Sequence, residues 1–280
     1  MRRKIFITIS ALLAGIIVTI SCSKEDSAKI ESGDIQVARE ETMASNIFDD
    51  AFVQANNAFS QKSGEMNNTK SASIPGISSK DSVIITIDNT DPATWPKTIT
   101  IDFGSGVTNN NIERKGKILV TVDGSYGLAG TKWIITFDGY EYNGYKVEGT
   151  KTVIYEGAND LQQPWFSISV RDAKITWPDG KTFTWNSERQ RTWTNIALLN
   201  PYENMFEITG TASGVNTDGV AYNISITSPL LVSPGCNNIK QGIMVISTEG
   251  NPDVTLDYGD GTCDNVITLS VGNATRDIEL

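Results

Sequence analysis

The residues with the most distinctive chemistry lie in one alternating stretch, 181–194, which reads KTFTWNSERQRTWT. In a β-strand every second side chain lies on the same face, so Trp185, Arg189, Arg191 and Trp193 share one face. Two arginines flanked by tryptophans can stack against sugars or hold an anionic group. The alternative is a core strand whose arginines extend over aromatic faces towards solvent. These four residues are therefore a ligand-binding candidate, with both interpretations open.

An acidic loop near the C-terminus, 257–264, reads DYGDGTCD and brings Asp257, Asp260 and Asp264 close together in sequence. Calcium binds several oxygen ligands, which makes the three carboxylates a weak metal candidate. The spacing does not match an EF-hand, because glycines stand where the second and third oxygen ligands belong. Asp260 followed by glycine is also typical of a tight hairpin turn. We rank the turn above a metal site and expect no cofactor.

Carboxylate-pair catalysis is the chemistry that remains for an enzyme, because the chain contains no histidine. That absence removes Ser-His-Asp and Cys-His nucleophiles and HExxH metal sites. Asp102, Asp138, Glu148 and Glu188 could form a glycosidase pair if folding brought two of them to within about 5 to 9 Å. Nothing in the sequence brings any two together, so we assign no catalytic residue.

The N-terminus has the pattern of a secretory signal: Arg2, Arg3 and Lys4 precede the largely apolar stretch 5–20. The stretch is interrupted by hydroxyl side chains and is too short to be a spanning helix. The following Ser21 and Cys22 resemble the cleavage site of bacterial lipoproteins. This resemblance implies a signal peptide over 1–21, a diacylated Cys22 and a polar tether over 22–34.

The tether also resembles those of Bacteroidota surface lipoproteins, because Cys22 is followed by the charged sequence SKED. This implies an anchor in the outer membrane that faces the cell exterior. Asp-Ser-apolar triplets centred on Ser27 and Ser82 resemble the O-glycosylation sequon of the same phylum. Both serines are therefore O-glycosylation candidates.

Cysteine usage and charge agree with an exported chain. With Cys22 assigned to lipid, Cys236 and Cys263 are left as an even pair, which predicts a disulfide in an oxidising compartment. Two separate buried thiols are the alternative. Without the three basic residues of the signal, 20 basic stand against 33 acidic residues, a net charge near −13. This argues against a nucleic-acid partner, which needs a clustered basic surface.

One amphipathic helix is predicted over 35–60, followed by a flexible Ser-rich linker over 61–80. Apolar residues recur there at helical spacing: Ala44, Ile47, Phe48, Ala51, Phe52, Ala55 and Phe59. Polar residues fill the other face: Asn46, Asp49, Asp50, Gln54 and Asn57. The sequence leaves open whether the helix docks on the following domain or serves as a stalk.

From residue 81 to 280 the hydrophobic pattern has period two, as in Ile99, Ile101 and Phe103. Hairpin dipeptides separate the runs, at 143–144, 179–180 and 218–219. We therefore expect an all-β antiparallel meander of long hairpins, with about ten or more strands. It would form a sandwich, a barrel or an open hairpin stack. Glycines at 116, 149, 180, 210, 242 and 272 recur every 30 to 33 residues, which suggests one repeat unit per hairpin.

The segments TLDYGDGTCDN and NGYKVEGTKTV, together with RKGKILVTVDG, ITFDGYEYNGYKVEGTKTV and ITGTASG, resemble a family of Bacteroidota surface-exposed lipoproteins of unknown function. The resemblance covers most of residues 98–280 and implies an all-β surface lipoprotein. It transfers no catalytic or binding residue. We expect a non-enzymatic binding or structural module whose partner is a glycan or an envelope protein. The alternatives are a carboxylate-pair carbohydrate-active enzyme and a lipid-carrying β-barrel or groove.

Overall fold

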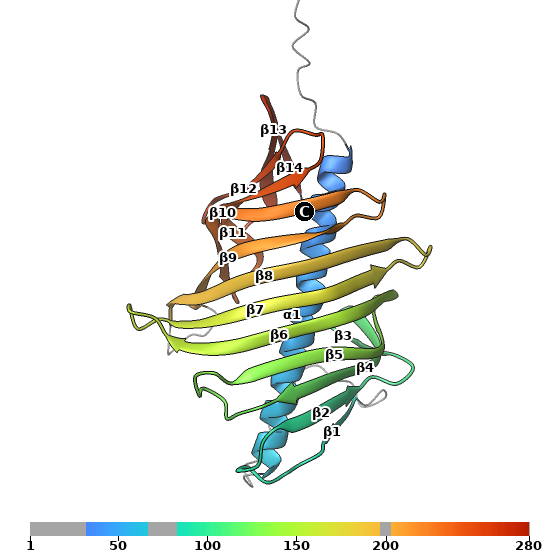
Figure 1. The fold of residues 1–280 in the computed structure, drawn as a ribbon, viewed down its shortest axis with the longest axis vertical. Helices are drawn as coiled ribbons and strands as arrows, with labels where there is room; N and C mark the ends of the chain where they lie inside the picture. Colours follow the sequence, from blue (N-terminus) through green and yellow to red (C-terminus); the bar gives the residue numbers. More distant parts are fainter. Residues whose placement is uncertain (1–31, 67–82, 197–202, 280) are drawn as a thin grey trace, which may run out of the picture.

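The protein is a single large antiparallel sheet that curves around one long helix (Figure 1). A computed structural model describes residues 32–66, 83–196 and 203–279. The helix α1 spans Ser32–Met66. The strands are β1 Ile84–Ile87, β2 Lys97–Asp102, β3 Val107–Asn109, β4 Ile112–Val122, β5 Lys132–Tyr142, β6 Tyr145–Ala158, β7 Pro164–Thr176, β8 Thr182–Asn195, β9 Met205–Val215, β10 Ala221–Ser233, β11 Cys236–Thr248, β12 Val254–Asp260, β13 Val266–Val271 and β14 Ala274–Glu279.

The sheet is a meander, which confirms the predicted fold class. Its 14 strands are antiparallel and follow the chain from β1 to β14, except that short β3 pairs with β4 beside the main path. β1 and β14 form the two edges of the sheet, so of the three expected architectures the open one is observed. Asn143 and Gly144, both with positive φ, make the two-residue turn between β5 and β6.

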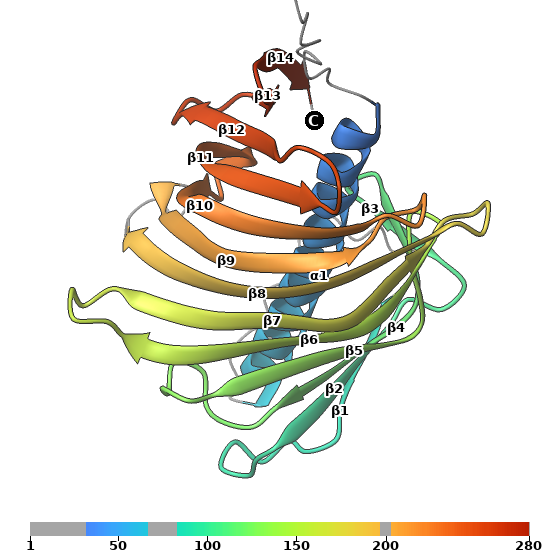
Figure 2. The same ribbon diagram turned by 45° about the horizontal axis from the view of Figure 1, so that its top comes forward.

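Bulges inside the strands account for the curvature seen in Figure 2. The pairing register shifts at Gly116 in β4, at Gly149 in β6 and at Gly242 in β11. At Gly210 in β9, a Cβ would lie 2.0 Å from the carbonyl oxygen of Glu188 on β8. Bulged strands bend and twist more than regular ones. Gly180 and Gly272 lie outside the strands, so the glycine spacing does not mark one repeated structural position.

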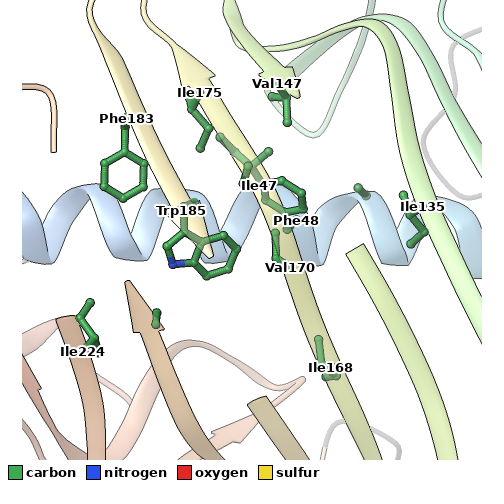
Figure 3. Packing of buried hydrophobic residues seen from close by; sticks show 14 of the residues in the cluster. Ile47, Phe48, Ile135, Val147, Ile168, Val170, Ile175, Phe183, Trp185 and Ile224 are labelled. Carbon is green, nitrogen blue, oxygen red and sulfur yellow. The ribbon is translucent and has the colours of Figure 1, made fainter. Parts of the chain in front are cut away.

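The helix packs its small and apolar residues against the concave face of the sheet. Its fully buried residues include Ala44, Ile47, Phe48, Ala51 and Ala55, all predicted for the apolar face. Figure 3 shows Ile47 and Phe48 among side chains from several strands. The ring of Phe48 lies 5.5 Å from that of Trp185 on β8, centroid to centroid. The helix is therefore a core element of the β domain and not a separate stalk.

The helix is longer than the sequence pattern predicts. It continues through residues 61–66, which we expected to belong to the linker, and the rest of that linker, 67–80, lies outside the described residues. In the part of the chain that the structure describes, no helix is both long enough and apolar enough to cross a membrane.

Candidate ligand-binding groove

The face of β8 that carries Trp185, Arg189, Arg191 and Trp193 points inward, towards the helix. Trp185 is buried, and its Nε1 donates a hydrogen bond of 2.6 Å to Oε2 of Glu41 on α1. Arg189 forms an ion pair with the other oxygen of the same carboxylate, at 2.7 Å. Trp185 is therefore not available to stack a sugar at the surface. Its indole and the Arg189 guanidinium hold the helix on the sheet.

A second charged group lies two helical turns further along α1. Asp49 accepts hydrogen bonds from Lys151 on β6 and from Arg191 on β8. Burial opposes ionisation of Asp49, but the charges of Lys151 and Arg191 prevail and lower its pKa to about 2. Burial lowers the pKa of the Lys151 ammonium, against the attraction of Asp49. Only 3% of the Lys151 side chain is exposed, so this charge depends on its partner.

Several carboxylates on the polar side of the helix also contact the sheet or its loops. Asp50 forms two hydrogen bonds with the guanidinium of Arg114 on β4. Glu40 accepts a hydrogen bond from Thr217. Because the sheet curves around the helix, carboxylates on more than one side of α1 reach strands. These contacts fix the rotation of the helix about its own axis.

Burial also acts on Glu41, whose side chain is 4% exposed. Loss of hydration raises the pKa of Glu41, and the nearby charge of Arg189 and the two hydrogen bonds offset only part of that rise. Both carboxylate oxygens of Glu41 are bound. The carboxyl group is thus a structural acceptor for the indole and the guanidinium.

A cavity of about 350 Å³, here called the inner cavity, lies between α1 and β6–β13. Its charged wall contains the Glu41–Arg189 pair and the group of Asp49, Lys151 and Arg191. The remaining wall combines aliphatic side chains, among them Ile168, Val170, Leu230 and Met244, with polar ones such as Ser45 and Asn238. The disulfide between Cys236 and Cys263 joins the start of β11 to the loop after β12. Cys236 lines the cavity, so the disulfide supports one of its walls.

Three buried polar atoms of β8 have no hydrogen-bond partner among the described residues. They are Oγ of Ser187, Nη1 of Arg189 and Nε of Arg191. All three residues line the inner cavity, and the side chain of Arg189 is 10% exposed. Buried polar groups are nearly always bonded, so three unpaired atoms on one strand require an explanation.

A second space of about 430 Å³, here called the aromatic groove, adjoins the first. Its lining includes seven aromatic side chains: Phe52, Tyr126, Trp133, Tyr155, Phe166, Trp193 and Phe206. Trp193 packs edge to face on Phe206, with ring centroids 4.5 Å apart. Ile168 and Arg191 line both the groove and the inner cavity, so the two spaces share a wall.

The carboxylates of the acidic loop bind groups of their own turn. Asp257 and Asp260 each accept a hydrogen bond from the backbone amide two residues later, and Asp264 binds Thr262 and the Val266 amide. In the described part of the chain, no group of three or more histidine, cysteine, aspartate or glutamate side chains could hold a metal ion. The loop carboxylates stabilise the turn.

The four acids considered for glycosidase chemistry lie on four different strands. Asp102 forms an ion pair with Lys117, Glu148 with Lys146, and Glu188 with Arg171. Most of the side chains in these three pairs are at least one-third exposed, as expected for charges on the outer face of the sheet. The lipidation candidate Cys22 and the glycosylation candidates Ser27 and Ser82 lie outside the described residues.

Sequence reasoning missed four residues of the site: Glu41, Asp49, Lys151 and Ser187. Two of them did carry a signal. Glu41 stands in the helical stripe that contains Ala38 and Ala44, and a carboxylate at a core position needs a buried partner. Lys151 has the same strand parity as the buried Val153 and is itself 2% exposed. A charged residue in register with core residues is the pattern to look for.

No protein-family model matches this chain, and no curated protein sequence or solved structure matches it either. The functional proposal therefore rests on the geometry of the groove.

Proposed function

We propose that the protein is a non-enzymatic binding protein, anchored to the outer membrane through a lipid on Cys22 and facing the cell exterior. Its aromatic groove takes a small apolar molecule between α1 and the sheet. One observation carries the proposal: seven aromatic side chains from the helix, the strands and one loop line a single groove of about 430 Å³. Ligand pockets typically have volumes of about 300 to 1,000 Å³ and mainly apolar walls.

The composition of the groove favours an apolar ligand over a glycan. Besides Arg191, its polar side chains include Asn56 and Thr131, and the Thr131 hydroxyl already donates to the Ser125 carbonyl. A sugar would bury many hydroxyl groups, each of which costs free energy unless it is hydrogen-bonded. This lining therefore supports the lipid-carrying groove ahead of the glycan or envelope-protein module that the sequence also allowed.

The arrangement gives no support to a carboxylate-pair enzyme. Glu41 and Asp49 line the inner cavity, but each is bound through both oxygens, to Trp185 and Arg189 or to Lys151 and Arg191. A general acid or a nucleophile needs an oxygen that can reach the substrate. The oxygens of these two carboxylates already bind side chains of the sheet and so attach α1 to it.

The proposed anchor lies close in sequence to the start of α1. The helix begins at Ser32, ten residues after Cys22. Ten extended residues span at most about 35 Å. A lipid on Cys22 would thus keep the start of α1 within about 35 Å of the membrane surface. Labelling of the intact chain with radioactive palmitate, and its loss in Cys22→Ala, tests the anchor independently of the groove.

Binding is tested with residues 23–280, which contain every element that the structure describes. The probe is N-phenyl-1-naphthylamine, a neutral dye that fluoresces in apolar surroundings. We expect saturable binding, with an affinity at least about fivefold weaker in Trp193→Ala, because one aromatic wall is removed. Leu161→Ala is the matched control, because Leu161 is an exposed apolar residue outside the groove lining. Equal loss in both variants, or no saturable binding by the parent, would refute the proposal and favour a structural role.

A further inference from the structure

We propose that the groove selects amphiphilic monocarboxylates, with the carboxylate held by Arg189 and Arg191 in the inner cavity and the apolar body in the aromatic groove. This inference rests on the proposed binding function and names its ligand class. Its starting point is the wall shared by the two spaces. Arg191 lines both, so a molecule lying in the aromatic groove has one end beside the arginines.

The unpaired donors of β8 supply the carboxylate contacts. Nη1 of Arg189, Nε of Arg191 and Oγ of Ser187 are buried. None of these three atoms has a hydrogen-bond partner among the described residues. Alternate residues of a strand are about 6.6 Å apart, so two long guanidinium side chains two positions apart can converge on one anion. One nitrogen of each guanidinium is unpaired, so a carboxylate between them can accept one charge-assisted hydrogen bond from each arginine. An anion here satisfies donors that the protein leaves unpaired.

The charge of the inner cavity calls for a monoanion. Three cations, Lys151, Arg189 and Arg191, face two carboxylates: Glu41, which is buried, and Asp49, whose side chain is 40% exposed. Asp264 also lines the cavity, but it is exposed and both its oxygens are bound to its own loop. An uncompensated buried charge is costly, and a single negative charge balances this group.

The walls of the inner cavity indicate an organic anion and not an inorganic one. Ile168 and Val170 lie on the same strand, β7, with Val170 nearer to Trp185 (Figure 3). Both line the cavity, as do Leu230 and Met244. Phosphate or sulfate would leave these aliphatic surfaces uncovered. An alkyl chain attached to the carboxylate covers them and continues into the aromatic groove.

The test compares three competitors of equal chain length on residues 23–280: decanoate, decanol and decylamine. Each competitor is titrated against bound N-phenyl-1-naphthylamine, at concentrations below those at which the competitor forms micelles. We expect decanoate to displace the dye at a concentration about tenfold or more below that of decanol, because it adds charge-assisted hydrogen bonds. Decylamine should be no better than decanol. The melting temperature with each compound gives a second readout that does not depend on the dye.

Arg189→Lys and Arg191→Lys keep the charge for the helix carboxylates but remove the unpaired guanidinium donors. We expect each to weaken decanoate about tenfold. Arg189→Lys should leave decanol unchanged, whereas Arg191→Lys should affect decanol less than decanoate, because Arg191 also lines the aromatic groove. Arg171→Lys is the matched control, because Arg171 pairs with exposed Glu188 and lines neither space. If an arginine variant fails to fold, Ser187→Ala removes one unpaired hydroxyl without touching an ion pair, and it should weaken decanoate alone.

The outcomes separate the two proposals. Dye binding with equal displacement by decanoate and decanol would overturn the carboxylate site and leave the groove standing. A decanoate preference that persists in all three β8 variants would also overturn it. Absence of dye binding, together with no rise in melting temperature for any of the three compounds, would refute both the groove and its ligand class.

Discussion

Replacing Arg189 by Gln should make the stability of the protein strongly dependent on pH. The change leaves Glu41, whose side chain is 4% exposed, with the Trp185 indole as its remaining hydrogen-bond donor. Removing one partner of a buried ion pair costs about 3 to 5 kcal/mol, because the other charge stays buried and uncompensated. For a domain whose free energy of unfolding is typically about 5 to 15 kcal/mol, this is a large fraction.

The pH dependence follows from the pKa of Glu41. Burial raises this pKa above its ordinary value of 4.5, and Arg189 opposes the rise, so loss of Arg189 raises it further. Above pH 4.5 the folded variant then holds a proton that the unfolded chain has released. Between pH 4.5 and the pKa of Glu41 in the folded variant, the free energy of unfolding therefore falls as pH rises, by about 1.4 kcal/mol per pH unit. The deficit relative to the parent should be larger at pH 7 than at pH 5.

The assay is urea unfolding followed by tryptophan fluorescence at both pH values, with extrapolation to zero denaturant. The double variant Glu41→Gln/Arg189→Gln should recover most of the loss and have the same deficit at pH 5 and pH 7, because no buried charge is left unpaired. Arg171→Gln, which breaks an exposed pair, should cost less than about 1 kcal/mol. A deficit in Arg189→Gln that is equal at both pH values would refute the reasoning. So would a double variant as unstable as the single one.

Three further perturbations address other parts of the structure. Reduction of the disulfide between Cys236 and Cys263, 27 residues apart, should lower the free energy of unfolding by about 3.5 kcal/mol, measured in urea with and without dithiothreitol. Gly210→Ala should cost about 2 kcal/mol or more, because its Cβ would lie 2.0 Å from a carbonyl oxygen, whereas Gly139→Ala has open space and should cost about 1 kcal/mol; equal losses would contradict the steric argument. Between pH 4 and pH 2 the parent should lose roughly 1 kcal/mol more free energy of unfolding than Asp49→Asn, because the pKa of Asp49 is lowered to about 2 in the folded protein. The difference is kept small because 40% of the Asp49 side chain is exposed. Identical acid unfolding curves would contradict this reasoning.

Local chemistry made the elements of this protein predictable from its sequence. Period-two alternation specifies strands, and turn dipeptides such as that at 143–144 pair each strand with the next. Helical spacing located α1 because its alanines and aromatic residues repeat every three or four positions. An even pair of cysteines indicated the disulfide that the structure contains. Each of these signals depends on residues that are close in sequence or few in number.

The groove depended on the tertiary structure, because its partners are far apart in sequence. Glu41 and Arg189 are separated by 148 residues, and Asp49 and Arg191 by 142. Strand parity placed Arg189 and Arg191 on one face, but it could not say whether that face meets solvent or a helix. Glycine bulges curve the sheet until strands lie along more than one side of α1, and only that curvature brings the arginines of β8 to the helix carboxylates. Parity and periodicity specify which side chains share a face, whereas the bending of the sheet decides what each face meets.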